Sequence, residues 1–471
     1  MIILGTNSIK DTGYDVANSA RFENSSSDYL NRTPSSASNR KTFTFSFWVK
    51  RTKLGTNDTI YNVRPDSNGA NRLSFHSTTD TFRIALEPIG KYIFTTRKFR
   101  DVSAWYHIVA AFDTTQGTAS DRVKIYINGV QEGSLVKGDG GAATYPDENT
   151  DLDINRDVVI NIGRDLETSS DFIDMYLAEF VFIDGQQLAP TSFGEFDEDS
   201  GIWKPIDVSG LTFGTNGFYL DFENSGSLGA DVSGNGNNFT VNNLTAIDSV
   251  SDVPTNNFAT LNPLIYSSAS KTYSEGNTAI STSDSGNWCA TQNNIGVSSG
   301  KWYMEIKITN KAYLFAVGVG FNPLDSNGSN VTAFINSTYL VGEDTGTYGW
   351  RDNGALPQGG TSISTYTTND ILMIALDMDN LKVYFGKNGT WENSGDPTSG
   401  ATGTGSMGNL TAGEDYFFIV TPRNGSASVN FGSPAFAISS GNTDGNSYGN
   451  FEYAVPSGYY SLNSKNLAEY G

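Results

Sequence analysis

The chain is poor in the residues that build most metal and redox sites. Cys289 is the only cysteine among 471 residues, so no disulfide can form within the chain and no cysteine-based zinc site is possible. His76 and His107 are the only histidines, which excludes a histidine-rich metal site. Any metal bound by this chain must therefore be held mainly by oxygen ligands.

Long apolar runs and basic residues are also scarce. No run approaches the ~18 apolar residues of a membrane-spanning helix. The N-terminus, MIILGTNSIK, has no basic region before its apolar residues, so we expect no secretory signal. Lys and Arg number 30 against 51 Asp and Glu, a formal net charge of −21. This charge repels phosphate backbones and makes nucleic acid an unexpected partner, whereas basic partners, divalent cations and neutral glycans stay open.

Helical periodicity is lacking, and alternating strand patterns take its place. In FTFSFWVK, Phe43, Phe45, Phe47 and Val49 fall on one face and the intervening residues on the other. Similar runs recur along the chain between Gly, Asn and Asp clusters, and the 50 glycines favour tight turns. The low apolar content suits sandwiches that leave one face of each sheet in water. We therefore predict an all-β protein.

The length and two similar halves predict two tandem antiparallel β-sandwiches of jelly-roll type. Each half opens with an aromatic-rich strand and later contains an Asn-Gly hairpin, at Asn128-Gly129 and Asn388-Gly389. The stretch between the halves is rich in Gly, Asn and Asp. We predict a sandwich over 1–195, an irregular connector over 196–265 that wraps on the sandwiches, and a second sandwich with a C-terminal tail over 266–471.

Both halves resemble known families. The first contains, in order, FSFWVK, WYHIVAAFD, VKIYINGVQEG, NIGRD and YLAEFVFIDGQQL. These segments resemble the strands of laminin G-like, concanavalin A-like domains over about 18–195. The second contains GKWYMEIKI, AVGVGF, YGWRDNG, NDILMIALDMDNLKVYFGKNGTW and YFFIVTPRNGSASVNFG. These resemble a SPRY domain over about 290–435, again a concanavalin A-like sandwich.

The connector and the tail FEYAVPSGYYSLNSKNL look like segments found around such domains in phage proteins. This resemblance implies a virion component, made in the host cytoplasm without a signal peptide and homo-oligomeric on the particle beside other virion proteins. We expect a tail-fibre or tail-associated adhesin that recognises a host-surface glycan or protein. A capsid decoration or head-fibre protein is the alternative, and a glycan depolymerase is a third possibility.

The catalytic motif of glucanases with this fold is incomplete. Those enzymes carry Glu-x-Asp-x-x-Glu on a strand, which places the catalytic carboxylates on one face. The nearest match begins at Glu195 and Asp197 but has Ser200 where the last Glu belongs. His107 alternates with Trp105 and Val109 and reads as a packed strand residue. We therefore predict a non-enzymatic protein with no catalytic residues.

Calcium is the one cofactor that the sequence leaves open. Laminin G-like domains bind it at the sandwich rim, and calcium needs six to eight oxygen ligands. The acidic loop with Asp147, Asp151 and Asp153 is the predicted site, and a solvated charged loop is the alternative.

For ligand recognition, the resemblance to SPRY domains indicates loops at one edge of the sandwich. The aromatic, arginine and acidic residues expected there are Tyr348, Trp350, Arg351, Asp352 and Trp391. Tyr, Trp and Arg are the usual hot-spot types, and aromatic rings also stack on sugars. The alternative is that these aromatic rings belong to the core.

Overall fold

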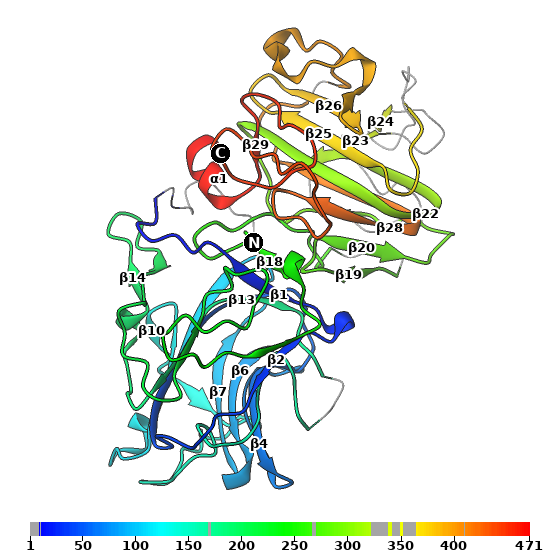
Figure 1. The fold of residues 1–471 in the computed structure, drawn as a ribbon. Coiled ribbons are helices and arrows are strands. Elements are labelled where there is room, and N and C mark those ends of the chain that lie inside the picture. The colour runs from blue at the N-terminus through cyan, green and yellow to red at the C-terminus, as the bar shows by residue number, and fades with distance from the viewer. Residues whose placement is uncertain are drawn as a thin grey trace. The chain divides into compact units, whose positions relative to one another are not determined.

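The computed structural model contains two compact units, Thr12–Thr255 and one formed by Asn256–Gly471 (Figure 1). The structure describes residues 9, 11–167, 171–265, 270–321, 338–341, 349–351, 364–408 and 410–471. Across these residues strands dominate, and the one α-helix is α1 (Ser464–Tyr470), drawn in red in Figure 1. None of the helices in this described part has the length and hydropathy of a membrane span.

Two large antiparallel sheets form the first unit. The sheet that we call the β3 sheet has the order β10 (Val130–Gln131), β9 (Val123–Ile127), β8 (Trp105–Asp113), β3 (Thr42–Arg51), β13 (Met175–Asp184), β1 (Ser19–Phe22) and β18 (Ser249–Val250), with β16 (Phe218–Leu220) also on β13. The sheet that we call the β5 sheet has the order β11 (Leu135–Val136), β7 (Lys91–Lys98), β6 (Thr81–Leu86), β5 (Gly69–Phe75), β4 (Asp58–Asp66), β12 (Ile160–Ile162), β2 (Tyr29–Arg32) and β17 (Thr240–Asn242).

The predicted alternation of β3 places its apolar face in the core. Phe43, Phe45, Phe47 and Val49 are fully buried in one cluster with residues of the β5 sheet. Burying side chains of this size contributes roughly 1.5–3 kcal/mol each. The all-β prediction of antiparallel concanavalin A-like sandwiches is thus confirmed for the strands of this unit.

The opposite face of β3 is also buried, which corrects the expectation that each sheet has a face in water. Trp48 and Lys50, on that face, are 4% and 1% exposed. They lie beneath later segments of the chain, which include Trp203 of β15 (Trp203–Pro205). Strand β15 pairs with β14 (Gly194–Phe196). These covering residues come from the stretch predicted as a connector. That stretch also places Phe218 and Phe239 in the core between the sheets.

Both predicted Asn-Gly hairpins are confirmed. Asn128 and Gly129 have φ of 48° and 79°, and Asn388 and Gly389 have φ of 48° and 83°, the positive values of a type I′ turn. In each turn the Asn side-chain oxygen accepts a hydrogen bond from a neighbouring strand, from the His107 N–H at 2.7 Å or from the Ile371 N–H at 2.8 Å. The two hairpins therefore share one construction.

The second unit is built around two long strands. β22 (Lys301–Phe321) pairs with β28 (Tyr416–Asn430), with shifts of register after Ile308 and Lys311. The other strands are β19 (Thr272–Ser274), β20 (Ala279–Thr282), β21 (Thr291–Gln292), β23 (Thr338–Val341), β24 (Gly349–Arg351), β25 (Ile371–Asp377), β26 (Lys382–Lys387), β27 (Thr390–Trp391) and β29 (Tyr460–Ser461). Most of GKWYMEIKI and all of AVGVGF, which are separate segments in the sequence analysis, belong to the single strand β22.

The C-terminal segment covers an outer sheet face in the second unit. Phe451 and Tyr459 pack against Tyr303, Met373 and Tyr384. Glu305, fully buried on β22, anchors this cover: its Oε1 accepts the backbone N–H of Tyr453 at 2.8 Å and its Oε2 that of Glu452 at 3.0 Å. A buried carboxylate thus holds the returning chain on the sheet.

The first hairpin gives a test of how tightly the cover packs. A Cβ added at Gly129 would lie 2.3 Å from the Trp203 ring, and its φ is positive. We expect Gly129→Ala to lower the free energy of unfolding by about 2–4 kcal/mol, through backbone strain and overpacking. Gly133→Ala is the control, because nothing lies within 4 Å of its added Cβ. Equal stabilities of the two variants in denaturant titrations would contradict this packing.

Candidate functional site

The predicted recognition loop falls largely outside the described residues. Tyr348 and Asp352 lie there. Trp350 and Arg351 belong to β24, where Trp350 pairs with Tyr339 and Arg351 with Thr338 of β23. The binding role of all four stays a prediction.

Trp391, the fifth predicted recognition residue, lies in β27 and is partly buried. Its ring packs against the aromatic cluster under the C-terminal cover, with its centroid 6.4 Å from that of Tyr303. Its surroundings are therefore those of the cover, and a role in binding stays a prediction.

The three carboxylates of the predicted calcium loop do not converge. Asp147 lies 3.0 Å from the Lys91 Nζ, Asp151 lies 4.0 Å from the Lys41 Nζ, and Asp153 lies 2.9 Å from an Arg156 Nη. Over the described ranges no group of three or more His, Cys, Asp or Glu side chains is arranged to hold a metal. These three residues do not form the shared oxygen cage that calcium needs, and calcium binding elsewhere stays a prediction.

An exposed aromatic ring and an arginine meet at the bend of β22 and β28. Tyr313 lies in the irregular stretch between Lys311 and Leu314, and its side chain is 47% exposed. Leu314 pairs with Arg423, whose guanidinium carbon lies 5.0 Å from the centroid of the Tyr313 ring. The shifted register turns the ring away from the core, and the cation–π contact keeps it beside Arg423.

A preformed loop borders this ring. One Asp284 side-chain oxygen accepts the backbone N–H groups of Gly286 at 2.7 Å and Asn287 at 2.9 Å. Arg423 Nε donates to the Ser285 carbonyl at 2.7 Å, and the Asn424 N–H donates to that of Asp284 at 2.8 Å. The Asn287 side chain also donates to the Asp284 carboxylate, at 3.1 Å. This bond first, and then the two backbone N–H bonds, lower the pKa of Asp284, and the charge of Arg423 adds to the effect. We call Tyr313, Arg423 and residues 284–287 the Tyr313 platform.

The Tyr313 platform presents groups that suit a polar ligand. No described residue provides a hydrogen-bond partner for the Tyr313 hydroxyl or for the Arg423 Nη groups. An exposed ring stacks on the apolar face of a sugar, while the arginine and the ionised Asp284 can bond its hydroxyls. The sequence prediction missed this site. Two features of the sequence could have indicated it. The strand alternation breaks in NKAY, residues 310–313, and an Asn424-Gly425 pair is typical of a turn.

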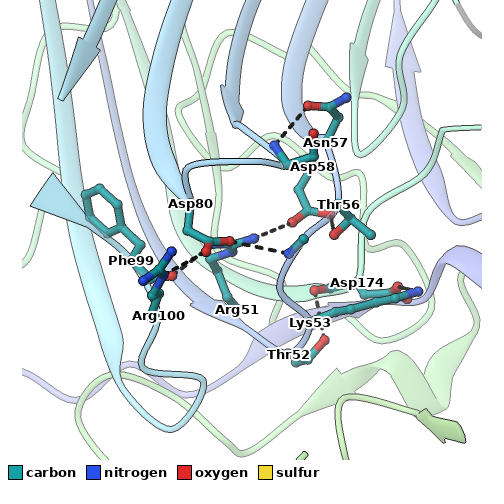
Figure 2. Close-up of polar contacts among 12 residues, drawn as sticks. Arg51, Thr52, Lys53, Thr56, Asn57, Asp58, Asp80, Phe99, Arg100 and Asp174 are labelled. Atoms are coloured by element: carbon teal, nitrogen blue, oxygen red, sulfur yellow. Dashed lines mark hydrogen bonds and ion pairs between the residues drawn. The ribbon is translucent and has the colours of Figure 1, made fainter. Parts of the chain in front are cut away.

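The rim of the first unit contains a network of ion pairs (Figure 2). Arg51, fully buried, bonds Asp58 at 3.1 Å and Asp80 at 3.3 Å. Arg100 also bonds Asp80, at 2.9 Å. Burial raises the pKa of Asp58 to about 7, and Arg51 opposes that rise. Because cations already surround these carboxylates, the network fixes the rim loops instead of forming an open cation site.

Ser46 and His107 form a pair that superficially resembles a catalytic dyad. His107 Nε2 lies 2.8 Å from the Ser46 hydroxyl, and Trp203 Nε1 donates to His107 Nδ1 at 2.9 Å. Since Nδ1 accepts, the ring proton of neutral His107 is on Nε2, facing Ser46, so this nitrogen cannot take the serine proton. Burial lowers the pKa of His107 to about 3. His107 is packed between Trp48 and Trp203, as predicted.

The incomplete glucanase motif lies in an exposed hairpin. Glu195 of β14 is 58% exposed and lies 3.3 Å from the Lys204 Nζ. Asp197 accepts a hydrogen bond from the Ser200 hydroxyl at 2.7 Å. Asp197 also lies 3.6 Å from the Lys204 Nζ, so one ammonium pairs with both carboxylates, and Ser200 stabilises the Asp197 turn.

Glu179 is a buried carboxylate of the first unit in an unusual backbone conformation. It lies at the bulge of β13, where the register with β3 shifts between Ala178 and Val181, and its φ is 50°. Its Oε2 accepts the hydroxyls of Tyr219 at 2.7 Å and Tyr14 at 3.2 Å. Burial is the main cause that raises the pKa of Glu179 to about 7, against its ordinary value of 4.5. The group joins two separate segments to the outer face of the β3 sheet.

Stability should therefore depend on pH through Glu179. Because its pKa is higher in the folded chain, protonation favours folding. The stabilisation is complete below about pH 4.5 and is lost as the pH rises through about 7. We expect Glu179→Gln to unfold with a free energy up to about 3 kcal/mol higher than the wild type at pH 8, and nearly equal at pH 4.5. Urea titrations at both pH values measure this. A difference that does not change with pH would contradict it, since Asp58 contributes equally to both proteins.

A comparison with family models agrees with the laminin G-like resemblance of the first unit. Solved structures similar to the chain include the SPRY domain of human HERC1 (17% identity, TM-score 0.25, 32% of this chain and 87% of that chain) and a heptameric SAP-like pentraxin from Limulus polyphemus (14%, 0.26, 37% and 80%). The TRIM65 PSpry domain is another (10%, 0.27, 36% and 90%). A comparison with curated proteins finds no match. Residues 24–185 match the laminin G family model described as the concanavalin A-like lectin/glucanases superfamily.

Proposed function

We propose that this protein is a non-enzymatic adhesin on the surface of a phage particle and that it binds a host-surface glycan through the Tyr313 platform. The observation that carries the proposal is the juxtaposition of an exposed, oriented ring with a guanidinium whose Nη groups have no partner among the described residues. A lectin-type fold in the first unit supports the same class of function.

The ligand class follows from charge and chemistry. A net charge of −21 repels nucleic acid, whereas a neutral glycan carries no opposing charge. The ring of Tyr313 offers stacking area, and the Asp284 loop is already ordered by its own hydrogen bonds. Little conformational entropy is then lost when a sugar binds, so that modest contacts suffice for affinity.

The particle setting rests on the resemblance of the connector and the C-terminal tail to segments of phage proteins. In this proposal the protein attaches to other virion proteins as a homo-oligomer. Several copies on one particle would add avidity to weak individual glycan contacts.

Replacing Tyr313 tests the binding site. We expect Tyr313→Ala to weaken binding to host-envelope polysaccharide at least tenfold, because stacking area is lost, without a change in melting temperature. Binding is measured by calorimetry or on glycan arrays with the full chain. Phe196→Ala is the matched control, since Phe196 is 49% exposed and lies in the other unit.

Three results would contradict parts of this proposal. Unchanged affinity in Tyr313→Ala would exclude the Tyr313 platform as the binding site. An equal loss in Phe196→Ala would mean that exposed rings bind nonspecifically. Release of reducing ends from the polysaccharide, lost in Glu195→Gln, would overturn the non-enzymatic part and favour a depolymerase.

The particle location is tested by labelling. Antibodies raised against the purified chain should decorate phage particles in negative-stain electron microscopy, and pre-incubation with them should lower adsorption to host cells. Label on the tail supports the adhesin. Label spread over the head, with adsorption unchanged, would favour the alternative of a capsid decoration protein, and unlabelled particles would exclude both.

A further inference from the structure

Two cations on the rim of the first unit stand out on this acidic chain. Phe99 belongs to the hydrophobic core, and its N–H donates to the Asp80 carbonyl at 2.8 Å. In an extended chain its neighbours Lys98 and Arg100 therefore point away from the core, and both are exposed. β7 ends at Lys98, and two residues of chain can separate the Cα atoms of Lys98 and Arg100 by at most roughly 7 Å. Both side chains can thus reach a single small ligand.

The buried network orients Arg100 (Figure 2). Asp80 is held by Arg51, which is fully buried and also donates to the Phe99 carbonyl at 2.9 Å, and by the Gly55 N–H at 3.3 Å. Asp80 in turn accepts from Arg100 Nε at 2.9 Å. This bond uses the Nε edge of the guanidinium and leaves the Nη groups, on a side chain that is 53% exposed, without a partner among the described residues.

Lys98 completes the pair. Its ammonium has no hydrogen-bond or ion-pair partner in the described part of the chain. Arg51 and Arg100 pair with Asp58 and Asp80, so these four charges balance, and Lys98 adds a positive charge that no described carboxylate neutralises. Lys53 is bound to Asp174 at 3.3 Å and so is not available to neutralise an incoming ligand.

We propose that Lys98 and Arg100 form a subsite for an oxyanion carried by an acidic polysaccharide, such as a sulfate ester or a uronate carboxylate. Arginine with two free Nη donors binds such groups in a bidentate manner, and lysine adds a charge beside it. The site is independent of the Tyr313 platform. The net charge of −21 repels acidic polymers as it repels nucleic acid, so their binding depends on local contacts between their anionic groups and this rim.

The test compares three polymers of similar size with the full chain at low ionic strength: dextran sulfate, polygalacturonate and uncharged dextran. We expect binding to at least one of the two anionic polymers and none to dextran. Arg100→Gln should weaken this binding about tenfold or more, and Lys98→Gln about threefold. Binding to dextran sulfate alone assigns a sulfate ligand, and binding to polygalacturonate alone assigns a carboxylate.

Lys137→Gln is the matched control, because it removes one charge from a side chain 42% exposed in the same unit. It should bind like the wild type. An equal loss in Lys137→Gln, no loss in either rim variant, or no binding of either anionic polymer would overturn the proposal. Lys98→Gln disturbs no described contact of its side chain, so folding does not confound the result. Failure here would leave the Tyr313 platform untouched, since neutral glycan binding is measured separately.

Discussion

The structure depends on burying a second face of a sheet, which requires polar groups to be satisfied beneath a cover. In the first unit, Lys50 and Asp252 form an ion pair at 2.7 Å with both side chains 1% exposed. Asp252 also accepts the Trp105 Nε1–H at 3.2 Å. An unpaired charge at this depth would cost several kcal/mol, so the cover and the sheet must stay together.

The same solution recurs in the second unit with different residues. Glu305 accepts two backbone N–H groups of the C-terminal segment, and burial raises its pKa. Asp444, in that segment, accepts the Ser461 N–H at 2.9 Å and an Asn466 side-chain N–H at 2.8 Å. Strands are held by ladders of backbone hydrogen bonds. In segments with little regular structure, buried carboxylates accept the backbone N–H groups instead. Each unit keeps its irregular chain ordered in this way.

These covers determine where ligands can reach. The aromatic residues of the outer face of the β3 sheet, including Trp48 and Trp105, are unavailable for sugar stacking because they pack under a cover that includes Trp203. Exposed binding groups then remain at rims and bends. Tyr313 is exposed because an irregular register turns it outward, and Arg100 because the chain leaves β7 there. Arg100 is oriented by its bond to Asp80 in the buried Arg51 network, and Arg423 by its bond to the Asp284 loop, so both arginines are preorganised.

The sequence by itself determined the local structure. Alternation predicted the core face of β3, the Asn-Gly pairs predicted both type I′ turns, and the motif order predicted a laminin G-like first half. These succeed because period-two burial and positive φ are properties of short segments. Only the tertiary structure decided that Trp48 and Lys50 are buried, that Glu179 links Tyr14 to Tyr219, and that Tyr313 meets Arg423. Tyr14 and Glu179, like Tyr313 and Arg423, are more than a hundred positions apart, and no local pattern records which distant segment will cover a face or complete a site.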